Sequence, residues 1–499
     1  KPLAEEVLKG LRRGDIAFVP ERWKKVNIDW LENVKDWNIS RQLWWGHQIP
    51  AWYCEDCQAV NVPKPERYLE DPTSCEACGS PRLKRDEDVF DTWFSSALWP
   101  LSTLGWPEET EDLKAFYPGD VLVTGYDILF LWVSRMEVSG YHFMGERPFK
   151  TVLLHGLVLD EKGQEASKST GSGVAPSAMG GRYGAAALRV ALASLATGGQ
   201  DIRLDLRWLE MARNFANKLY NAARFVLLSR EGFQAKEDTP TLADRFMRSR
   251  LSQGVEEITA LYEALDLAQA AREVYELVWS EFCDWYLEAA KPALKAGNAH
   301  TLRTLEEVLA VLLKLLHPMM PFLTSELYQA LTGKEELALE AWPEPGGRDE
   351  EAERAFEALK QAVTAVRALK AEAGLPPAQE VRVYLEGETA PVGENLEVFR
   401  FLARADLLPE RPAKALVKAM PRVTARMPLE GLLDVEEWRR RQEKRLKELL
   451  ALAERSQRKL ASPGFREKAP KEVVEAEEAR LRENLEQAER IREALSQIG

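Results

Sequence analysis

The hydrophobic pattern of this 499-residue chain changes near Arg207, and this change constrains the fold more than any other feature. Before it, apolar runs at residues 121–125 and 149–160 flank a helical pattern at 126–144, which is the spacing of a βαβ unit with parallel strands. After it, long amphipathic patterns predict a bundle of packed helices at residues 208–230, 241–266, 268–292, 302–316 and 319–331. At roughly 100–200 residues per domain, the chain is predicted to be a multidomain protein with α/β and all-α parts.

The last third of the chain has two further patterns. After a Pro/Gly-rich linker at 342–351, a helix at 352–372 precedes strand-like runs at 380–387 and 415–428, which together predict a small α/β unit. In the tail, apolar residues recur at three-to-four spacing on both sides of the sequence SPGF at 462–465. This pattern predicts a C-terminal antiparallel coiled coil.

Composition excludes several classes of protein. The net charge is −13, which argues against a protein coated for indiscriminate nucleic-acid binding. No apolar run approaches the roughly 18 residues of a membrane span, and no signal peptide is visible, so we expect a soluble cytoplasmic protein with no membrane partner. The chain begins with Lys rather than Met, and we expect it to be a piece of something longer.

Four of the five cysteines form two C-x-x-C pairs, Cys54 with Cys57 and Cys75 with Cys78. Each pair aims two thiolates at one point, and four thiolates make the closed tetrahedral shell of a structural zinc site. The alternative is a pair of free-thiol turns that bind no metal. Because a closed shell leaves no position for water, the predicted Zn²⁺ is structural rather than catalytic.

A Gly/Ser-rich loop at residues 163–173 lies between a predicted strand and a predicted helix. At its centre, Lys168 stands between Ser167 and Ser169, an arrangement that is suited to hold a polyphosphate. The loop lacks the pattern of a Walker A motif, and most loops of this composition are simple connectors.

Two helical segments are candidates for RNA contact. The helix at 208–230 has Glu210 as its only acid and carries Arg213, Lys218, Arg224 and Phe225, although its apolar positions fit the core stripe of a bundle helix equally well. Residues 439–459 hold nine bases and three acids, and Arg440, Arg441, Lys444 and Arg445 lie in their first part. One interpretation is that these bases form a phosphate-binding face. The other is that they form a solvated surface of the coiled coil, whose charge is neutralised by the acid-rich helix after residue 465.

Several segments together resemble the class I aminoacyl-tRNA synthetases, and within them the valyl branch. The matching stretches are Trp37–Pro50 (WNISRQLWWGHQIP), Asp88–Ser96 (DVFDTWFSS), Thr124–Trp132 (TGYDILFLW), His155–Gly156, Asn214–Val226 (NFANKLYNAARFV) and Phe465–Val474 (FREKAPKEVV). They span nearly the whole chain in the family's order.

The resemblance implies a fold and a division of the chain. The expected architecture is the second half of a Rossmann-type nucleotide-binding fold with a zinc-knuckle insertion, a helical-bundle anticodon domain, a small α/β unit and the coiled coil. The implied segments are 1–40 (tail of the inserted editing region), 41–115 (zinc knuckle and active-site segment), 116–206 (second half of the catalytic domain), 207–345 (anticodon-binding domain), 352–432 (small α/β unit) and 433–499 (tRNA-binding hairpin).

The resemblance also implies an activity, in which ATP and Mg²⁺ activate valine as valyl-adenylate and the valyl group passes to the 2′-hydroxyl of the terminal adenosine of tRNA(Val). The implied ATP-binding residues are Gly125, Asp127, His155, Gly156 and Lys168. Lys168, Ser167 and Ser169 would be catalytic. Trp93 and Ile128 would wall the valine pocket, and the implied enzyme is a monomer.

The sequence departs from the family at two places. The K-M-S-K-S signature stands here as residues 165–169 with Glu165 in place of its first lysine. The H-I-G-H motif and most of the editing insertion are absent, so we expect half of the ATP site to be missing and this chain alone to be inactive. The alternative is a non-catalytic tRNA-binding protein on the same scaffold.

Overall fold

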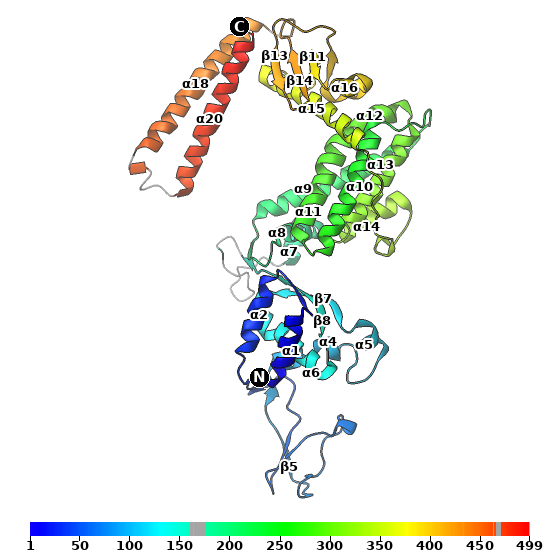
Figure 1. Cartoon of the computed structure of the whole chain (residues 1–499), viewed down its shortest axis with the longest axis vertical. Helices are drawn as coiled ribbons and strands as arrows, with labels where there is room; N and C mark the ends of the chain where they lie inside the picture. The colour runs from blue at the N-terminus through cyan, green and yellow to red at the C-terminus, as the bar shows by residue number, and fades with distance from the viewer. Residues whose placement is uncertain (160–162, 164–175, 433, 463, 466–470, 499) are drawn as a thin grey trace. The chain divides into compact units, whose positions relative to one another are not determined.

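The computed structural model describes residues 1–159, 163, 176–432, 434–462, 464–465 and 471–498 (Figure 1). The chain forms two compact units. Unit 1 contains Lys1–Ala212 and Leu261–Ala271, and unit 2 contains Arg213–Ala260 and Arg272–Gly499. Each unit is described by itself below.

Unit 1 is built on a three-stranded parallel sheet with strand order β1-β8-β7. Its strands are β1 (Ala17–Val19), β8 (Phe149–His155) and β7 (Gly119–Gly125). The chain leaves β7 through a 3₁₀ turn and a π-helical turn, forms α6 (Ser134–Met144) and returns along β8, which confirms the predicted βαβ unit. Strand β1 was not predicted, because three residues are too short to show a periodic pattern.

Helices cover this sheet and close its core. Helix α1 (Pro2–Arg13) packs on α6, and α2 (Arg22–Glu32) packs on α1 and β1. The core between them is apolar and fully buried, with the residues Leu11, Ile16, Leu129, Val133, Met136 and Val152. The core therefore holds the carboxyl ends of β7 and β8 at one fixed edge of the sheet.

A polar group lies inside this core. Glu137 of α6 is completely buried, and Asn27 of α2 donates a hydrogen bond of 2.8 Å to its Oε2 atom. Ser134 donates to the Oδ1 atom of Asn27 at 2.6 Å, which fixes the orientation of the amide. Burial raises the pKa of Glu137 to about 8, so its side chain is protonated at neutral pH.

The predicted strand at 149–160 is two strands. After β8 the backbone turns at Gly156, and β9 (Val158–Leu159) pairs with β10 (Ile202–Arg203) in a separate sheet. A Cβ atom at Gly156 would lie 1.8 Å from the carbonyl oxygen of Gln200, so only glycine fits at this crossing. Helices α7 (Pro176–Tyr183) and α8 (Ala185–Leu195) precede β10.

The segment between α2 and β7 is made of short elements. Strands β2 (Ser40–Arg41) and β6 (Val89–Phe90) pair with each other, and β3, β4 and β5 form a small antiparallel sheet. The bounds of the remaining elements are β3 (Trp52–Cys54), β4 (Val60–Asn61), β5 (Leu83–Arg85), α3 (Thr92–Ser96), α4 (Trp99–Ser102) and α5 (Glu111–Phe116).

Unit 2 begins with the predicted helical bundle. Its helices are α9 (Leu206–Arg230), α10 (Leu242–Glu263), α11 (Leu267–Glu276), α12 (Leu287–Ala296), α13 (Ala299–Leu316) and α14 (Pro321–Thr332). The first turns of α9, the end of α10 and the first half of α11 belong to unit 1. The predicted helix at 268–292 is a continuous helical run, but its middle, Leu277–Tyr286, is π-helical.

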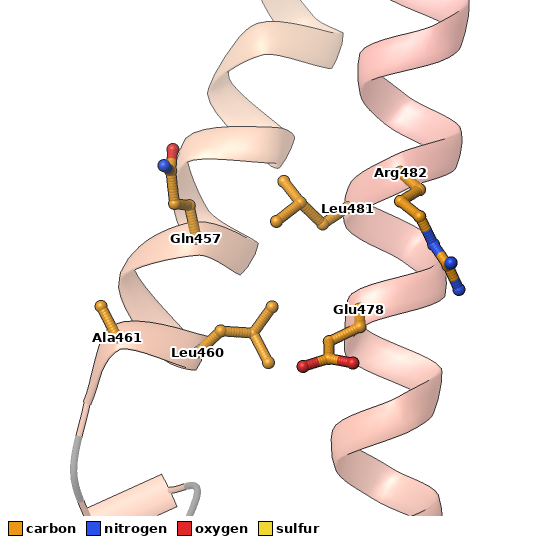
Figure 2. A pocket seen from close by; sticks show the side chains of 6 residues that line it. All are labelled: Gln457, Leu460, Ala461, Glu478, Leu481 and Arg482. Carbon is orange, nitrogen blue, oxygen red and sulfur yellow. The ribbon is translucent and has the colours of Figure 1, made fainter.

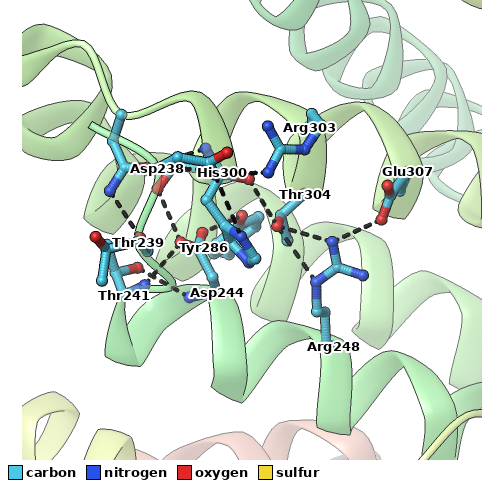
Figure 3. A network of polar contacts seen from close by, with 12 residues as sticks. Asp238, Thr239, Thr241, Asp244, Arg248, Tyr286, His300, Arg303, Thr304 and Glu307 are labelled. Carbon is cyan, nitrogen blue, oxygen red and sulfur yellow. Dashed lines mark hydrogen bonds and ion pairs between the residues drawn. The ribbon is translucent and has the colours of Figure 1, made fainter. Parts of the chain in front are cut away.

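A buried carboxylate joins three of these helical segments (Figure 3). Asp244 of α10 is fully buried and accepts hydrogen bonds from the Tyr286 hydroxyl at 2.7 Å and the Thr301 hydroxyl at 2.8 Å. The backbone N–H of Thr241 donates to the same carboxylate at 3.0 Å. These partners satisfy both carboxylate oxygens, as burial of a charged group requires.

The predicted small α/β unit follows. Helix α15 (Glu350–Ala373) packs on a four-stranded sheet with strand order β12-β11-β14-β13. Residues 415–428 form two strands rather than one, because the chain reverses between β13 and β14. The elements are β11 (Val381–Gly387), β12 (Ala405–Leu407), β13 (Leu416–Ala419), β14 (Val423–Met427), α16 (Ala390–Glu394) and α17 (Leu396–Ala403).

The end of α15 is fixed by a buried lysine. Lys370 is 2% exposed, and its ammonium group donates to the carbonyl oxygens of Ala403 at 2.8 Å, Arg404 at 3.0 Å and Pro377 at 3.2 Å. Burial lowers the pKa of Lys370. The three carbonyl groups replace the hydration of the ammonium group and join α15 to the end of α17.

The tail is the predicted helical hairpin, made of α18 (Val435–Ala461) and α20 (Lys471–Ile498), which lie side by side (Figure 1). Arg439 near the start of α18 contacts the carbonyl oxygen of Ile498, and Ser456 near its end donates to Glu477, so the helices are antiparallel. Among the helices of the described residues, none is long and apolar enough to cross a membrane.

Candidate functional site

Four of the residues expected to bind ATP meet at the carboxyl edge of the parallel sheet of unit 1. Gly125 ends β7 and pairs in register with His155, which ends β8. Asp127 follows two residues after Gly125, and Gly156 follows His155 directly. Ligands of open α/β sheets bind outside the carboxyl ends of the strands, and this edge is therefore the candidate nucleotide site.

The geometry at this edge explains the glycine at position 125. A Cβ atom there would lie 2.3 Å from Oδ1 of Asp127 and 3.7 Å from Cε1 of His155. The backbone of Gly125 therefore leaves room for the exposed Asp127 carboxylate to lie over it. The His155 Nδ1 atom is 2.8 Å from the carbonyl oxygen of Gly156, which orients the imidazole ring.

The structure adds one residue that the sequence analysis missed. Oδ1 of Asp201 accepts hydrogen bonds from the Tyr126 hydroxyl and from the backbone N–H of Leu157, each at 3.0 Å. Asp201 thus ties the loop after β7 to the segment after β8. It is 75 residues from Tyr126 in sequence, and no local pattern marks it.

The two residues expected to wall the valine pocket are half-buried and lie on neighbouring elements. Trp93 is on α3, where its backbone N–H donates to Asp91 at 2.8 Å. Ile128 ends the 3₁₀ turn after β7, and the π-helical turn that follows packs on α3. Asp91 also pairs with Arg41, which fixes the start of α3.

The loop residues expected to be catalytic, Lys168, Ser167 and Ser169, lie outside the described residues, and so does Glu165.

The four cysteines of the C-x-x-C pairs come together. Their Sγ atoms all lie within 4.8 Å of one another, with 3.6 Å between Cys54 and Cys78 and 3.5 Å between Cys57 and Cys75. A tetrahedral zinc ion with Zn–S bonds of about 2.3 Å requires S···S distances of roughly 3.8 Å. The sulfur atoms therefore fit a Cys₄ zinc site.

The two halves of this cluster have the same backbone geometry. The N–H of Gln58 donates to the carbonyl oxygen of Cys54 at 2.9 Å, and that of Gly79 donates to Cys75 at 2.8 Å. Both Gln58 and Gly79 have a positive φ, which closes each turn tightly behind its cysteines. The repeated turn explains why the two pairs point at one centre.

Within the cluster, the surroundings favour the thiolate at Cys75, whereas the neighbouring thiols raise the pKa of Cys57 and raise that of Cys78 to about 12. Burial raises the pKa of Cys75, but the N–H groups of Cys78 and Ala77, the Cys57 thiol and the Asn61 amide oppose this, and the pKa falls to about 6. The Nδ2 atom of the buried Asn61 is 3.7 Å from Sγ of Cys75. Such outer hydrogen bonds orient the ligands of a metal site.

Helix α9 separates the residues expected to contact RNA into two groups. Arg213 and Arg224 are exposed on its outer face. Lys218 forms an ion pair with Asp284, and its ammonium group lies 3.8 Å from the centre of the Trp279 ring. Phe225 is half-buried beside Lys291, while Phe215, Leu219 and Ala222 belong to the core, as the alternative interpretation of this helix predicts.

The hairpin exposes the bases of its first arm. Figure 2 shows Leu460 of α18 and Leu481 of α20 pointing between the helices, and the buried face of α18 also includes Trp438, Leu449 and Ala453. Arg440, Arg441, Lys444 and Arg445 are all exposed. Arg441 is 3.8 Å from Glu437 of its own helix, and the other three form no ion pair among the described residues.

Few of the charges on α18 are paired with charges on α20. Among the described residues of the hairpin, one ion pair joins α18 to α20, between Lys459 and Glu477 at 2.9 Å. Ser456 donates to the same carboxylate at 2.7 Å, and these two contacts hold the pKa of Glu477 below its ordinary value. The bases at positions 440–445 therefore face solvent.

Three family descriptions match successive parts of the chain. Residues 1–205 match the class I tRNA synthetases (I, L, M and V). Residues 244–385 match the anticodon-binding domain of tRNA ligase, and residues 434–499 match the valyl tRNA synthetase tRNA binding arm.

Solved structures share the fold. The ternary complex of Agrobacterium radiobacter K84 agnB2 LeuRS, tRNA and LeuAMS has a TM-score of 0.52 at 22% identity, over 64% of this chain and 43% of that chain. The Mycobacterium tuberculosis methionyl-tRNA synthetase in complex with methionyl-adenylate has a TM-score of 0.53 at 19% identity, over 69% of this chain and 66% of that chain.

Sequence relatives extend over the whole chain. A valine–tRNA ligase of Thermus thermophilus is 97% identical over all 499 residues, and that of Deinococcus radiodurans is 48% identical over an alignment of 535 positions that covers all of this chain. In both cases the chain spans 58% of the length of the relative. The chain belongs to the valine–tRNA ligase family of the class I tRNA synthetases.

Proposed function

We propose that this chain forms part of an enzyme that activates valine with ATP and transfers it to tRNA(Val). The observation that carries the proposal is the meeting of Gly125 and Asp127 with His155 and Gly156 at one sheet edge, in a chain 97% identical to a valine–tRNA ligase. In the activation step, a carboxylate oxygen of valine bonds to the α-phosphorus of ATP, and pyrophosphate leaves with the electrons of the broken P–O bond. The tRNA 2′-hydroxyl then displaces AMP.

Each residue at the edge has a distinct role in this proposal. Asp127 accepts hydrogen bonds from the ATP ribose, and Gly125 leaves the space that this contact requires. His155 and Gly156 line the nucleotide beside it, while Lys168, Ser167 and Ser169 hold the phosphates as charge develops. Mg²⁺, when present with ATP, would supply further charge neutralisation. Trp93 and Ile128 enclose the valine side chain, and their fit excludes larger amino acids.

The remaining parts bind the tRNA and stabilise the chain. Arg213 and Arg224 of α9 and the exposed bases of α18 contact RNA phosphates. Cys54, Cys57, Cys75 and Cys78 hold a structural Zn²⁺, whose closed shell takes no part in the reaction. We propose a monomeric enzyme of the cytoplasm, where the four thiols stay reduced.

The proposal is tested by valine-dependent exchange of pyrophosphate into ATP. We expect the 499-residue chain alone to be inactive and the chain completed with the remaining sequence of its Thermus relative to be active. In the completed enzyme with lysine at position 165, Lys168→Ala should lower the adenylation rate by about 10²–10³, with a much smaller effect on valine affinity. A completed enzyme that binds tRNA but activates no amino acid would favour the non-catalytic alternative.

A further inference from the structure

A groove of about 590 Å³ runs between the base of the hairpin and the small α/β unit, inside unit 2. Its polar lining comes from four elements: Glu372 of α15, Lys418 of β13, Gln442 and Arg445 of α18, and Gln487 and Arg490 of α20. Three of these side chains are cationic and two are amides. The charged part of the lining is therefore mostly basic, in a chain whose net charge is −13, and the rest of the lining is small or apolar (Ala368, Ala371, Gly374, Ile491 and Ala494).

Two of the three cations that line the groove, Lys418 and Arg445, form no ion pair among the described residues, and the third, Arg490, forms a weak one. Lys418 is half-buried, and neither it nor Arg445 forms an ion pair among the described residues. Arg490 lies 3.8 Å from Glu486, but both side chains are largely exposed, and a pair of this kind contributes little. Cations held at separate points along a concave surface are suited to successive phosphates of one backbone.

The one acid that lines the groove is in an environment that disfavours its charge. Burial raises the pKa of Glu372, and Glu493 of α20 acts in the same direction, whereas Lys418 and Arg490 act against it. Arg445 of α18 faces the same groove. Lys418 and Arg490 offset the negative charge that this carboxyl group carries when it is ionised.

From this arrangement we infer that the groove binds the sugar-phosphate backbone of RNA, with Lys418, Arg445 and Arg490 on phosphates and Gln442 and Gln487 as hydrogen-bond donors. The inference rests on the proposed function, since it assumes that the chain binds tRNA. It goes further by adding the small α/β unit to the RNA-binding surface. Arg445 then joins the groove to the exposed bases of α18.

The test is the affinity of the 499-residue chain for tRNA(Val) as a function of salt, because each lost phosphate contact reduces the slope of log K against log salt by about one. We expect Lys418→Ala to reduce the slope by this amount and Lys418→Arg to keep it. The control is Lys414→Ala, since Lys414 is exposed in the same segment but does not line the groove. Glu372→Gln should strengthen binding at pH 8, where it removes a negative charge, an effect that a purely structural role for the groove does not predict.

The inference is overturned if Lys418→Ala and Lys414→Ala bind tRNA with the slope of the parent chain, or if the parent chain binds no RNA. The proposed function fails by a different measurement, the absence of valine-dependent pyrophosphate exchange in the completed enzyme. If inorganic phosphate binds the groove but all variants bind tRNA equally, the groove is an anion site without a role in RNA binding, and the inference is wrong.

Discussion

The backbone N–H of Val417 on edge strand β13 donates a hydrogen bond of 2.7 Å to the side-chain carbonyl oxygen of Gln497, in the last turn of α20. An edge strand leaves such groups without a partner in the sheet. Gln497 supplies one, and through it the hairpin is attached to the sheet of the small α/β unit.

Replacing Gln497 should loosen this attachment. Gln497→Ala leaves the N–H of Val417 without its acceptor and should cost about 1 kcal/mol. We expect faster hydrogen exchange at Val417 and an unchanged exchange rate in β11, at the centre of the sheet. Gln497→Glu keeps an acceptor oxygen and is the matched control. Equal protection of Val417 in all three proteins would contradict this assignment.

The cysteine cluster should bind one zinc ion per chain. Native mass spectrometry of the parent chain should show this ion, and Cys54→Ser should release it, because three thiolates no longer close the tetrahedral shell. Hydrogen exchange should then rise across residues 50–85 and stay unchanged in the helical bundle. Cys283→Ser is the control, since this cysteine is alone and buried in the π-helical segment. Carefully handled protein without metal would show that the cluster is a pair of free-thiol turns.

Gly125→Ala should displace the Asp127 carboxylate. The backbone at this position has φ −67° and ψ 146°, which alanine adopts freely, so the substitution acts through the added methyl group. In the completed enzyme we expect a higher KM for ATP and little change in the KM for valine. Gly180→Ala serves as the control, because nothing lies within 4 Å of its Cβ position. An unchanged KM for ATP would remove Asp127 from the nucleotide site.

The buried Glu137 should make unit 1 less stable as the pH rises. Its pKa is about 8 in the folded chain and ordinarily 4.5, so the folded state binds the extra proton between these values. Stability is then fully present below about pH 4.5 and is lost progressively as the pH rises to about 8, at roughly 1.4 kcal/mol per pKa unit. Glu137→Gln keeps an acceptor for Asn27 but cannot ionise.

The measurement for Glu137 is denaturant unfolding followed by tryptophan fluorescence, because ten of the fifteen tryptophans lie in residues 23–132. We expect Glu137→Gln to stabilise the chain at pH 8 and to have a smaller effect at pH 5. A stability difference that does not vary between these pH values would mean that Glu137 ionises as readily in the folded chain as in the unfolded one.

Neutralising Arg440, Arg441, Lys444 and Arg445 together should weaken tRNA binding and flatten its salt dependence, because fewer phosphate contacts release fewer counterions. In the completed enzyme, valine activation should not change, since it precedes the need for tRNA. The control replaces Arg480 and Arg492 of α20, each of which pairs with a glutamate of its own helix. If the hairpin melts earlier while tRNA binds equally at every salt concentration, these bases only stabilise the hairpin.

The periodic parts of the fold were predictable because burial alone defines them. Helices α9, α10, α13 and α18 follow their apolar stripes, and the C-x-x-C spacing predicted which four cysteines come together. The points where a predicted strand or helix is interrupted were not predictable, because they depend on residues that are far away in the sequence. The strand breaks at Gly156 because the backbone of Gln200 crosses close to it. Asp201 connects two loops because the fold brings the Tyr126 hydroxyl within hydrogen-bond distance of its carboxylate. Likewise, the sequence does not reveal that Lys218 is held by Asp284.

The ammonium group of Lys370 is stabilised by hydrogen bonds to three neutral carbonyl oxygens, and no carboxylate takes part in these contacts. Ions in solution screen the attraction between exposed charges but do not weaken these enclosed contacts with carbonyl dipoles. The junction of α15 with α17 should therefore stay intact at salt concentrations that strip a polyanion from the surface. A salt titration of tRNA binding should therefore leave this junction folded, so that a loss of binding with salt is not caused by its opening.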